Sequence, residues 1–198
     1  MKIAIEAQRI FRPNKHGMDF VALETIRELQ KRNDGNQYYV IVAPGEDRCL
    51  ENSANLSIIE VKYPTYPLWE QIGLPQAIKR LGVDLLHCTS NTAPLWCPVP
   101  LVLTLHDIIY LEPRQHRSPS LYQEMGWFYR RLVVPHIIKK CKKIITVSHF
   151  ECNCIQQALK IPVDQITTVY NGYSAHFRIQ KETCLLYTSP SPRDSTSS

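Results

Sequence analysis

The sequence predicts an α/β fold: one domain with a doubly wound, mostly parallel sheet of about seven strands. Two observations predict this fold. Short apolar segments rich in β-branched residues alternate along the chain with longer segments of helical periodicity. The chain has 198 residues, of which 44% are apolar and 21% charged, so it can bury the core of one ordinary domain.

Seven short segments have the composition of strands. In chain order they are Lys2–Ala7, Tyr38–Ala43, Leu56–Val61, Asp84–Cys88, Leu101–His106, Lys143–Val147 and Ile166–Tyr170. Several of these runs are almost continuously apolar, which is typical of strands that are covered on both faces. We therefore expect a parallel, Rossmann-like sheet with right-handed crossovers.

Helical segments separate the strands. Apolar residues at a period near 3.6 predict an amphipathic helix over Gly17–Arg32. Residues 67–81 predict a weaker helix that bends near Gly73 and Pro75. The sequence shows no internal repeat and no second domain.

Two further helices follow in the second half of the chain. The longest helical segment, Ser120–Lys142, contains Pro135, which we expect to kink it. Ser148 stands where the sixth strand ends and the segment Phe150–Leu159 begins, which is a helix-capping position.

Composition excludes several classes of protein. The chain has 23 Lys and Arg against 18 Asp and Glu, and its net charge of +5 is too small for a nucleic-acid-binding surface. The N-terminus lacks the long uncharged region of a signal peptide, and no segment is apolar over the length of a membrane span. Seven cysteines scattered through apolar segments indicate reduced thiols in a cytoplasmic protein. Cys152 and Cys154 lack a second ligand pair, so we expect no metal.

The end of the chain differs from the rest. Cys184–Ser198 is rich in Ser, Thr and Pro, as in a disordered tail. Back-translation of this segment also gives a DNA sequence that resembles a transposase-based sequencing adapter. We therefore expect residues 179–198 to be a non-native, disordered tail and exclude them from the fold.

In a doubly wound sheet, ligands bind at the carboxyl ends of the strands. This rule selects Gln8–Met18, Thr89–Asn91, His106–Ile108, Ser148–His149 and Asn171–Tyr173.

The first of these loops is basic. Arg9, Arg12 and Lys15 precede a predicted helix N-terminus near Gly17, where backbone N–H groups and the helix dipole attract an anion. The alternative is a solvated loop in which Gly17 only permits a tight turn. The G-x-G-x-x-G fingerprint of dinucleotide-binding proteins is absent, which argues against a dehydrogenase.

A histidine follows the fifth strand. His106 at this position can contact a sugar hydroxyl or a phosphate oxygen, and the adjacent carboxylate of Asp107 can fix its tautomer. The alternative is a histidine that caps the strand or packs in the core. His87, inside the fourth strand, is interpreted as a buried histidine with a hydrogen-bond partner. The motifs of serine hydrolases, P-loop proteins and zinc proteases are absent, so the residues alone indicate an anion- or nucleotide-binding α/β domain.

Basic residues are concentrated between Ile108 and Phe150. They are Arg114, Arg117, Arg130, Arg131, Lys139, Lys140, Lys142 and Lys143, against Glu112 and Glu124. They form either a solvated surface or a face for an anionic bilayer.

The succession of strand ends carries a resemblance. The segments KIAIEAQRIF, KHGMDFVALETIREL, LLHCTSNTAPL, LVLTLHDIIYLE, KKIITVSHFECNCI and VDQITTVYNGYSAHFR follow one another over Met1–Arg178. In this order and spacing they resemble the N-terminal half of a family 4 glycosyltransferase.

The resemblance implies two facing Rossmann-like domains with the active site between them. The N-terminal domain, residues 1–178 here, would hold the acceptor, and an absent C-terminal domain would bind the nucleotide sugar. Such enzymes usually retain the anomeric configuration and need no metal or other cofactor. One difference is that the family's loop usually has paired glycines, whereas this chain has Gly17 alone.

Site residues follow from the resemblance and from the positions of the strand ends. His106 matches the cleft histidine that contacts the transferred sugar. The expected donor- and acceptor-binding residues are His16, Gly17, Met18, Asp107, Ser148, Asn171 and Gly172. The first hypothesis is thus a fragment, inactive alone, of a hexosyltransferase that builds cell-envelope polysaccharide on a glycan or lipid-linked acceptor. The alternative is a stand-alone, non-catalytic module that binds an anion or a nucleotide.

Overall fold

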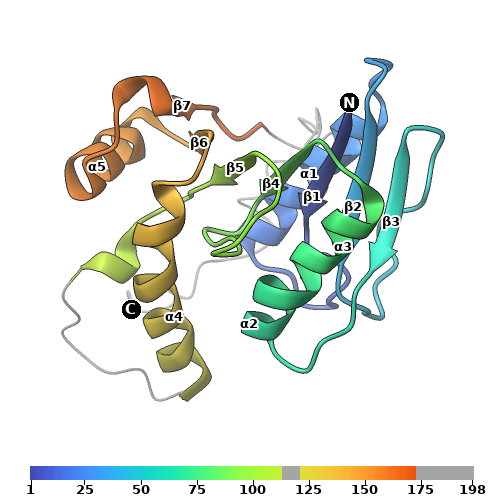
Figure 1. Ribbon diagram of the computed structural model, residues 1–198, viewed down its shortest axis with the longest axis horizontal. Helices are drawn as coiled ribbons and strands as arrows, with labels where there is room; N and C mark the ends of the chain where they lie inside the picture. The colour runs from blue at the N-terminus through green and yellow to red at the C-terminus, as the bar shows by residue number, and fades with distance from the viewer. Residues whose placement is uncertain (113–120, 173–198) are drawn as a thin grey trace, which may run out of the picture.

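The computed structural model describes residues 1–112 and 121–172 and contains the predicted sheet of seven parallel strands (Figure 1). The strands are β1 (Lys2–Glu6), β2 (Gln37–Val42), β3 (Leu56–Glu60), β4 (Leu85–Cys88), β5 (Leu101–Thr104), β6 (Lys143–Thr146) and β7 (Ile166–Thr168). Every strand pair is parallel. The predicted fold class is therefore confirmed.

The order of the strands reverses direction at the centre of the sheet. The order is β3-β2-β1-β4-β5-β6-β7, so the chain builds outward from β1 in one direction and then from β4 in the other. β1 and β4 are neighbours, with Glu6 opposite Cys88. This is the switch point at which doubly wound folds bind their ligands.

Helices connect the strands. They are α1 (Gly17–Gln30), α2 (Tyr66–Leu68), the π-helical turn η1 (Trp69–Gly73), α3 (Leu74–Leu81), the 3₁₀ turn η2 (Ile109–Leu111), α4 (Leu121–Ile138), α5 (His149–Leu159) and the 3₁₀ turn η3 (Val163–Gln165). All four predicted helices are present. Pro135 lies inside α4. The N-terminal cap predicted for α5 is also present, because the Ser148 hydroxyl accepts a hydrogen bond from the Glu151 N–H at 3.1 Å.

The predicted bend near Gly73 and Pro75 takes a different form. The irregularity is the wide turn η1, which leads directly into α3. Pro75 lies in the first turn of α3 and has no N–H to donate to the preceding turn, η1. Gly73 is required by packing, because a Cβ atom there would lie 2.6 Å from the ring of Tyr63.

Alternate residues of the central strands pack on opposite faces of the sheet. On β1, Ile5 joins one apolar cluster with Ile26 of α1, whereas Ala4 joins another with Ile78 of α3. Figure 1 shows α1 behind the sheet and α3 in front of it. The two clusters fix the carboxyl ends of β1 and β4 between these layers. Among the described helices, none has both the length and the apolar character to cross a membrane.

Candidate active site

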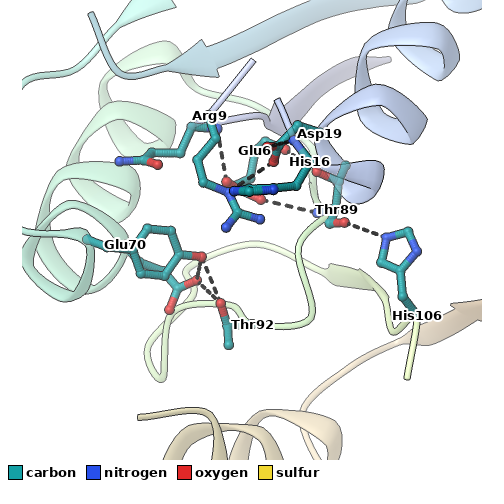
Figure 2. Close-up of polar contacts among 10 residues, drawn as sticks. Glu6, Arg9, His16, Asp19, Glu70, Thr89, Thr92 and His106 are labelled. Carbon is teal, nitrogen blue, oxygen red and sulfur yellow. Dashed lines mark hydrogen bonds and ion pairs between the residues drawn. The ribbon is translucent and has the colours of Figure 1, made fainter. Parts of the chain in front are cut away.

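Polar side chains meet where β1, β4 and β5 end, at the switch point of the sheet. They come from the loop between β1 and α1, the loop between β4 and β5, and the segment after β5. Figure 2 shows these residues and the hydrogen bonds and ion pairs between them.

His106 follows β5 and is held at two points. Its backbone N–H donates to Asn91 Oδ1 at 2.6 Å, and its ring Nε2 lies 3.0 Å from the carbonyl oxygen of Thr89. A carbonyl oxygen only accepts, so the neutral ring carries its proton on Nε2. Partial burial lowers the pKa of His106, which favours the neutral ring at pH 7.

Asp107 makes its hydrogen bond to the backbone rather than to the ring of His106. The expectation that its carboxylate fixes the tautomer of His106 is wrong, because the ring contacts the backbone of Thr89. Asp107 Oδ1 instead accepts from the N–H of Ile109, 3.3 Å away, at the start of η2. Its negative charge still acts on the imidazole, since it raises the pKa of His106 against the effect of burial.

The loop after β4 has a fixed conformation. Asn91 is buried and has a φ of +66°, a left-handed conformation that asparagine tolerates better than most residues. The Thr89 hydroxyl donates to the carbonyl oxygen of Glu6 at 2.8 Å, which ties the loop to the end of β1. Thr89 and Asn91 therefore hold His106 from a loop that is itself anchored to the neighbouring strand.

Glu6 is a buried acid at the end of β1. Its carboxylate accepts from the N–H of Gln8 at 3.0 Å and from the N–H of Thr89 at 3.3 Å. Burial raises the pKa of Glu6, while these hydrogen bonds and the charge of Arg9 oppose the rise. Glu6 thus joins β1 to β4 directly beside the switch point.

The loop after β1 is less positive than its sequence suggests. Arg9 Nε lies 3.0 Å from Asp19 Oδ1, and Asp19 also accepts from the backbone N–H of His16 at 2.9 Å. Lys15 forms an ion pair with Asp47 and donates to the carbonyl oxygen of Arg12. Two of the three basic side chains expected to attract an anion therefore have acidic partners.

His16, Gly17 and Met18 lie at the N-terminus of α1, as predicted. His16 is the N-cap, so the next N–H groups have no partner within the helix. Gly17 is exposed and has open space where a Cβ atom would lie, and its φ is not left-handed. The backbone conformation at this position therefore does not require a glycine.

The remaining predicted residues lie at the ends of β6 and β7. Ser148 follows β6, which is the neighbour of β5, and its hydroxyl caps α5. Asn171 and Gly172 are exposed after β7, at the edge of the sheet. Tyr173 and the tail 179–198 lie outside the described residues.

His87 has the partner expected of a structural histidine. Its Nε2 lies 2.8 Å from the Thr104 hydroxyl, and burial lowers its pKa to about 4. Within residues 1–112 and 121–172, no group of three metal-ligating side chains occurs, and the cysteines, Cys152 and Cys154 included, are unpaired.

Two buried acids near the site, Glu6 and Glu70, were missed by sequence reasoning. Each stands inside an apolar segment, in KIAIEA and in LWEQIGL. A charged residue in such a segment is buried only with partners, and this signal was available in the sequence.

Comparisons with known proteins agree with this architecture. The model of Glycosyltransferase Family 4 matches residues 16–177. A structure of HepE from Anabaena in complex with UDP-glucose superposes with a TM-score of 0.52 and 16% identity, covering 87% of this chain and 44% of HepE. A glycosyltransferase from Rickettsia africae has a TM-score of 0.48 and 17% identity, covering 85% of this chain and 42% of its own.

The wall teichoic acid polymerase TagF has a TM-score of 0.47 and 12% identity, covering 85% of this chain and 38% of TagF. The chain thus spans less than half the length of these proteins, and no curated protein matches it. The likeness to HepE shows a similar fold over most of this chain, and the family model also covers most of the chain. The chain belongs to Glycosyltransferase Family 4.

Proposed function

We propose that residues 1–178 form the acceptor-side domain of a glycosyltransferase that moves a hexose from a nucleotide sugar to a glycan or lipid-linked acceptor. The observation that carries the proposal is the polar edge at the switch point, where Thr89 and Asn91 hold a neutral His106. HepE, whose fold is similar, forms a complex with UDP-glucose, which supports a nucleotide sugar as donor.

In this proposal His106 contacts the transferred sugar. With the proton on Nε2 engaged by Thr89, the other nitrogen of the neutral ring, Nδ1, is an acceptor for a sugar hydroxyl. The residues proposed to bind donor or acceptor are His16, Gly17, Met18, Asp107, Ser148, Asn171 and Gly172.

The reaction proposed is retaining and independent of metal. Charge develops on the leaving diphosphate, and preorganised N–H donors and cations stabilise such charge. The N–H groups of Gly17 and Met18 at the start of α1 are the donors that this chain contributes. A second domain, which we propose follows in the complete protein, contributes the rest of the donor site.

We also propose that α4 rests on an anionic membrane surface from the cytoplasmic side. Met125, Phe128 and Leu132 recur at helical spacing and are 69%, 61% and 65% exposed. Arg131, next to Leu132, and Lys139, just after the end of α4, are exposed as well. Apolar side chains near basic ones suit the boundary of a bilayer with acidic lipids, where lipid-linked acceptors reside. The unpaired described cysteines suit a reducing compartment.

A transfer assay tests the proposed function. The source DNA is first read past the codon of Thr183 to obtain the complete protein that we propose. This protein and the present chain are then incubated in parallel with a panel of nucleotide hexoses and a lipid-linked or glycan acceptor. We expect transfer by the complete protein with one of the donors and none by this chain. Binding of a nucleotide sugar without transfer or hydrolysis by the complete protein would support the non-catalytic module instead.

A further inference from the structure

A second buried carboxyl group lies close to the candidate site. Glu70 has an exposed fraction of 0% and lies in the π-helical turn η1 between α2 and α3. Such turns are rare and occur frequently at functional sites. A buried carboxylate without hydrogen-bond partners costs free energy, so the partners of Glu70 indicate which segments this turn connects.

Glu70 accepts hydrogen bonds from three separate segments. Two donors belong to its own region: the Tyr66 hydroxyl at 2.7 Å and Gln71 Nε2 at 3.1 Å. The Thr92 hydroxyl, from the loop after β4, donates at 2.5 Å. The Tyr129 hydroxyl, from α4, donates as well. One carboxyl group therefore joins η1, α4 and the loop that follows β4.

The neighbouring Gln71 holds the same loop at two further points. Its Oε1 accepts from the N–H of Leu95 at 2.8 Å, and its Nε2 lies 3.3 Å from the carbonyl oxygen of Ala93. Gln71 Nε2 also donates to the Tyr129 hydroxyl at 2.7 Å. Two consecutive side chains of η1 thus fix residues 92–95.

This loop is the one that holds His106. Asn91 immediately precedes Thr92, and its Oδ1 is 2.6 Å from the backbone N of His106. Thr89 contacts the imidazole from the same loop, as Figure 2 shows together with the Glu70–Thr92 contact. The link from Glu70 to His106 therefore has three parts. Thr92 donates a hydrogen bond to the carboxyl of Glu70, a peptide bond joins Thr92 to Asn91, and Asn91 Oδ1 accepts from the backbone N–H of His106.

We propose that Glu70 is a positioning residue: by binding Thr92 it sets the conformation of residues 89–95 and thereby the orientation of His106. The proposal rests on the proposed function only in that His106 is a residue of the active site. Burial raises the pKa of Glu70 to about 7, against the hydrogen bonds from Thr92, Tyr129 and Tyr66, which favour its charged form. A buried carboxyl group, charged or neutral, needs such hydrogen-bond partners, and these donors supply them.

NMR spectra of this chain test the link without any assay of activity. The variant Glu70→Gln keeps the size of the side chain but places an N–H₂ group among donors. We expect the backbone amide and imidazole signals of His106 to move, and its amide exchange to become about tenfold faster, as expected for the loss of one buried hydrogen bond. Glu24→Gln, which removes an α1 carboxylate paired with Arg27, is the matched control and should leave these signals in place.

A milder variant keeps the test informative if Glu70→Gln does not fold. Tyr129→Phe removes a single hydroxyl donor and should move the same His106 and Asn91 signals in the same direction by a smaller amount. The proposal is overturned if the folded variants lose melting temperature while the signals of both residues coincide with those of the wild type. That result would leave the transferase proposal standing, because the transfer assay does not depend on Glu70.

Discussion

The imidazole Nε2 of His106 and the carbonyl oxygen of Thr89 lie 3.0 Å apart, a contact that joins the end of β5 to the loop after β4. The contact selects the tautomer with the proton on Nε2, and partial burial keeps the ring neutral by lowering its pKa. The fold therefore fixes the position, tautomer and neutral state of an imidazole that can form hydrogen bonds at the switch point.

The pH dependence of stability should reveal His87. Its pKa falls from 6.5, the ordinary value, to about 4 in the fold, so the folded state disfavours the charged ring. Its contribution to the free energy of unfolding is complete above pH 6.5 and is lost as the pH falls toward 4, at up to about 1.4 kcal/mol per pH unit.

Urea unfolding of the wild type and of His87→Gln over this range measures the effect. The difference in free energy between the two proteins should shrink as the pH falls. His136→Gln, at an exposed position of α4, serves as the control. A difference that stays constant from pH 7 to pH 4.5 would contradict the assignment of His87 as a buried neutral partner of Thr104.

Replacing either of two glycines by alanine should change the free energy of unfolding, in opposite directions at the two positions. A Cβ atom at Gly45 would lie 2.2 Å from the carbonyl oxygen of Phe11, a backbone atom of the loop after β1. We expect Gly45→Ala to lower the free energy of unfolding by about 1–3 kcal/mol. Gly126 lies inside α4 with open space around it, so Gly126→Ala should raise the free energy by up to about 1 kcal/mol. Chemical denaturation of both variants measures this, and equal effects would show that the loop at Gly45 adjusts freely.

Binding to vesicles tests the membrane-facing role of α4. The chain should sediment with anionic vesicles in a salt-sensitive manner, since each basic residue near the surface adds about 1 kcal/mol. Phe128→Ser should weaken this binding, whereas Phe20→Ser on α1, also an exposed phenylalanine, should not. Equal binding to neutral and anionic vesicles, or an equal loss of vesicle binding in the two variants, would contradict the proposal. The basic residues would then form only a solvated surface.

Much of the fold could be predicted from the sequence, because apolar runs with different periods identify strands and helices independently of tertiary contacts. The runs at Lys2–Glu6 and Leu101–Thr104 are strands for this reason. The turn η1 could not be predicted, because it depends on tertiary contacts: the packing of buried Trp69 and the hydrogen-bond donors around Glu70. The apolar periodicity of this segment predicts only a weak helix.

The site was predictable in position but not in its contacts. Strand topology places His106 at the carboxyl ends of the strands, and this requires only the order of elements. Which atom fixes its tautomer depends on the loop conformation at Asn91, whose left-handed φ brings distant residues together. Sequence adjacency favoured Asp107, whereas the fold supplies Thr89.

The central claim is that His106 acts on the sugar rather than on the fold, and His106→Ala in the complete enzyme tests it most directly. Turnover per folded molecule and melting temperature are measured on one preparation, with His136→Ala as the control. We predict that kcat and kcat/KM fall together by roughly a hundredfold, equivalent to about 3 kcal/mol, while the melting temperature falls by no more than the few degrees that loss of the hydrogen bond to Thr89 costs. Normal turnover with a lowered melting temperature would contradict the account and make His106 a structural residue.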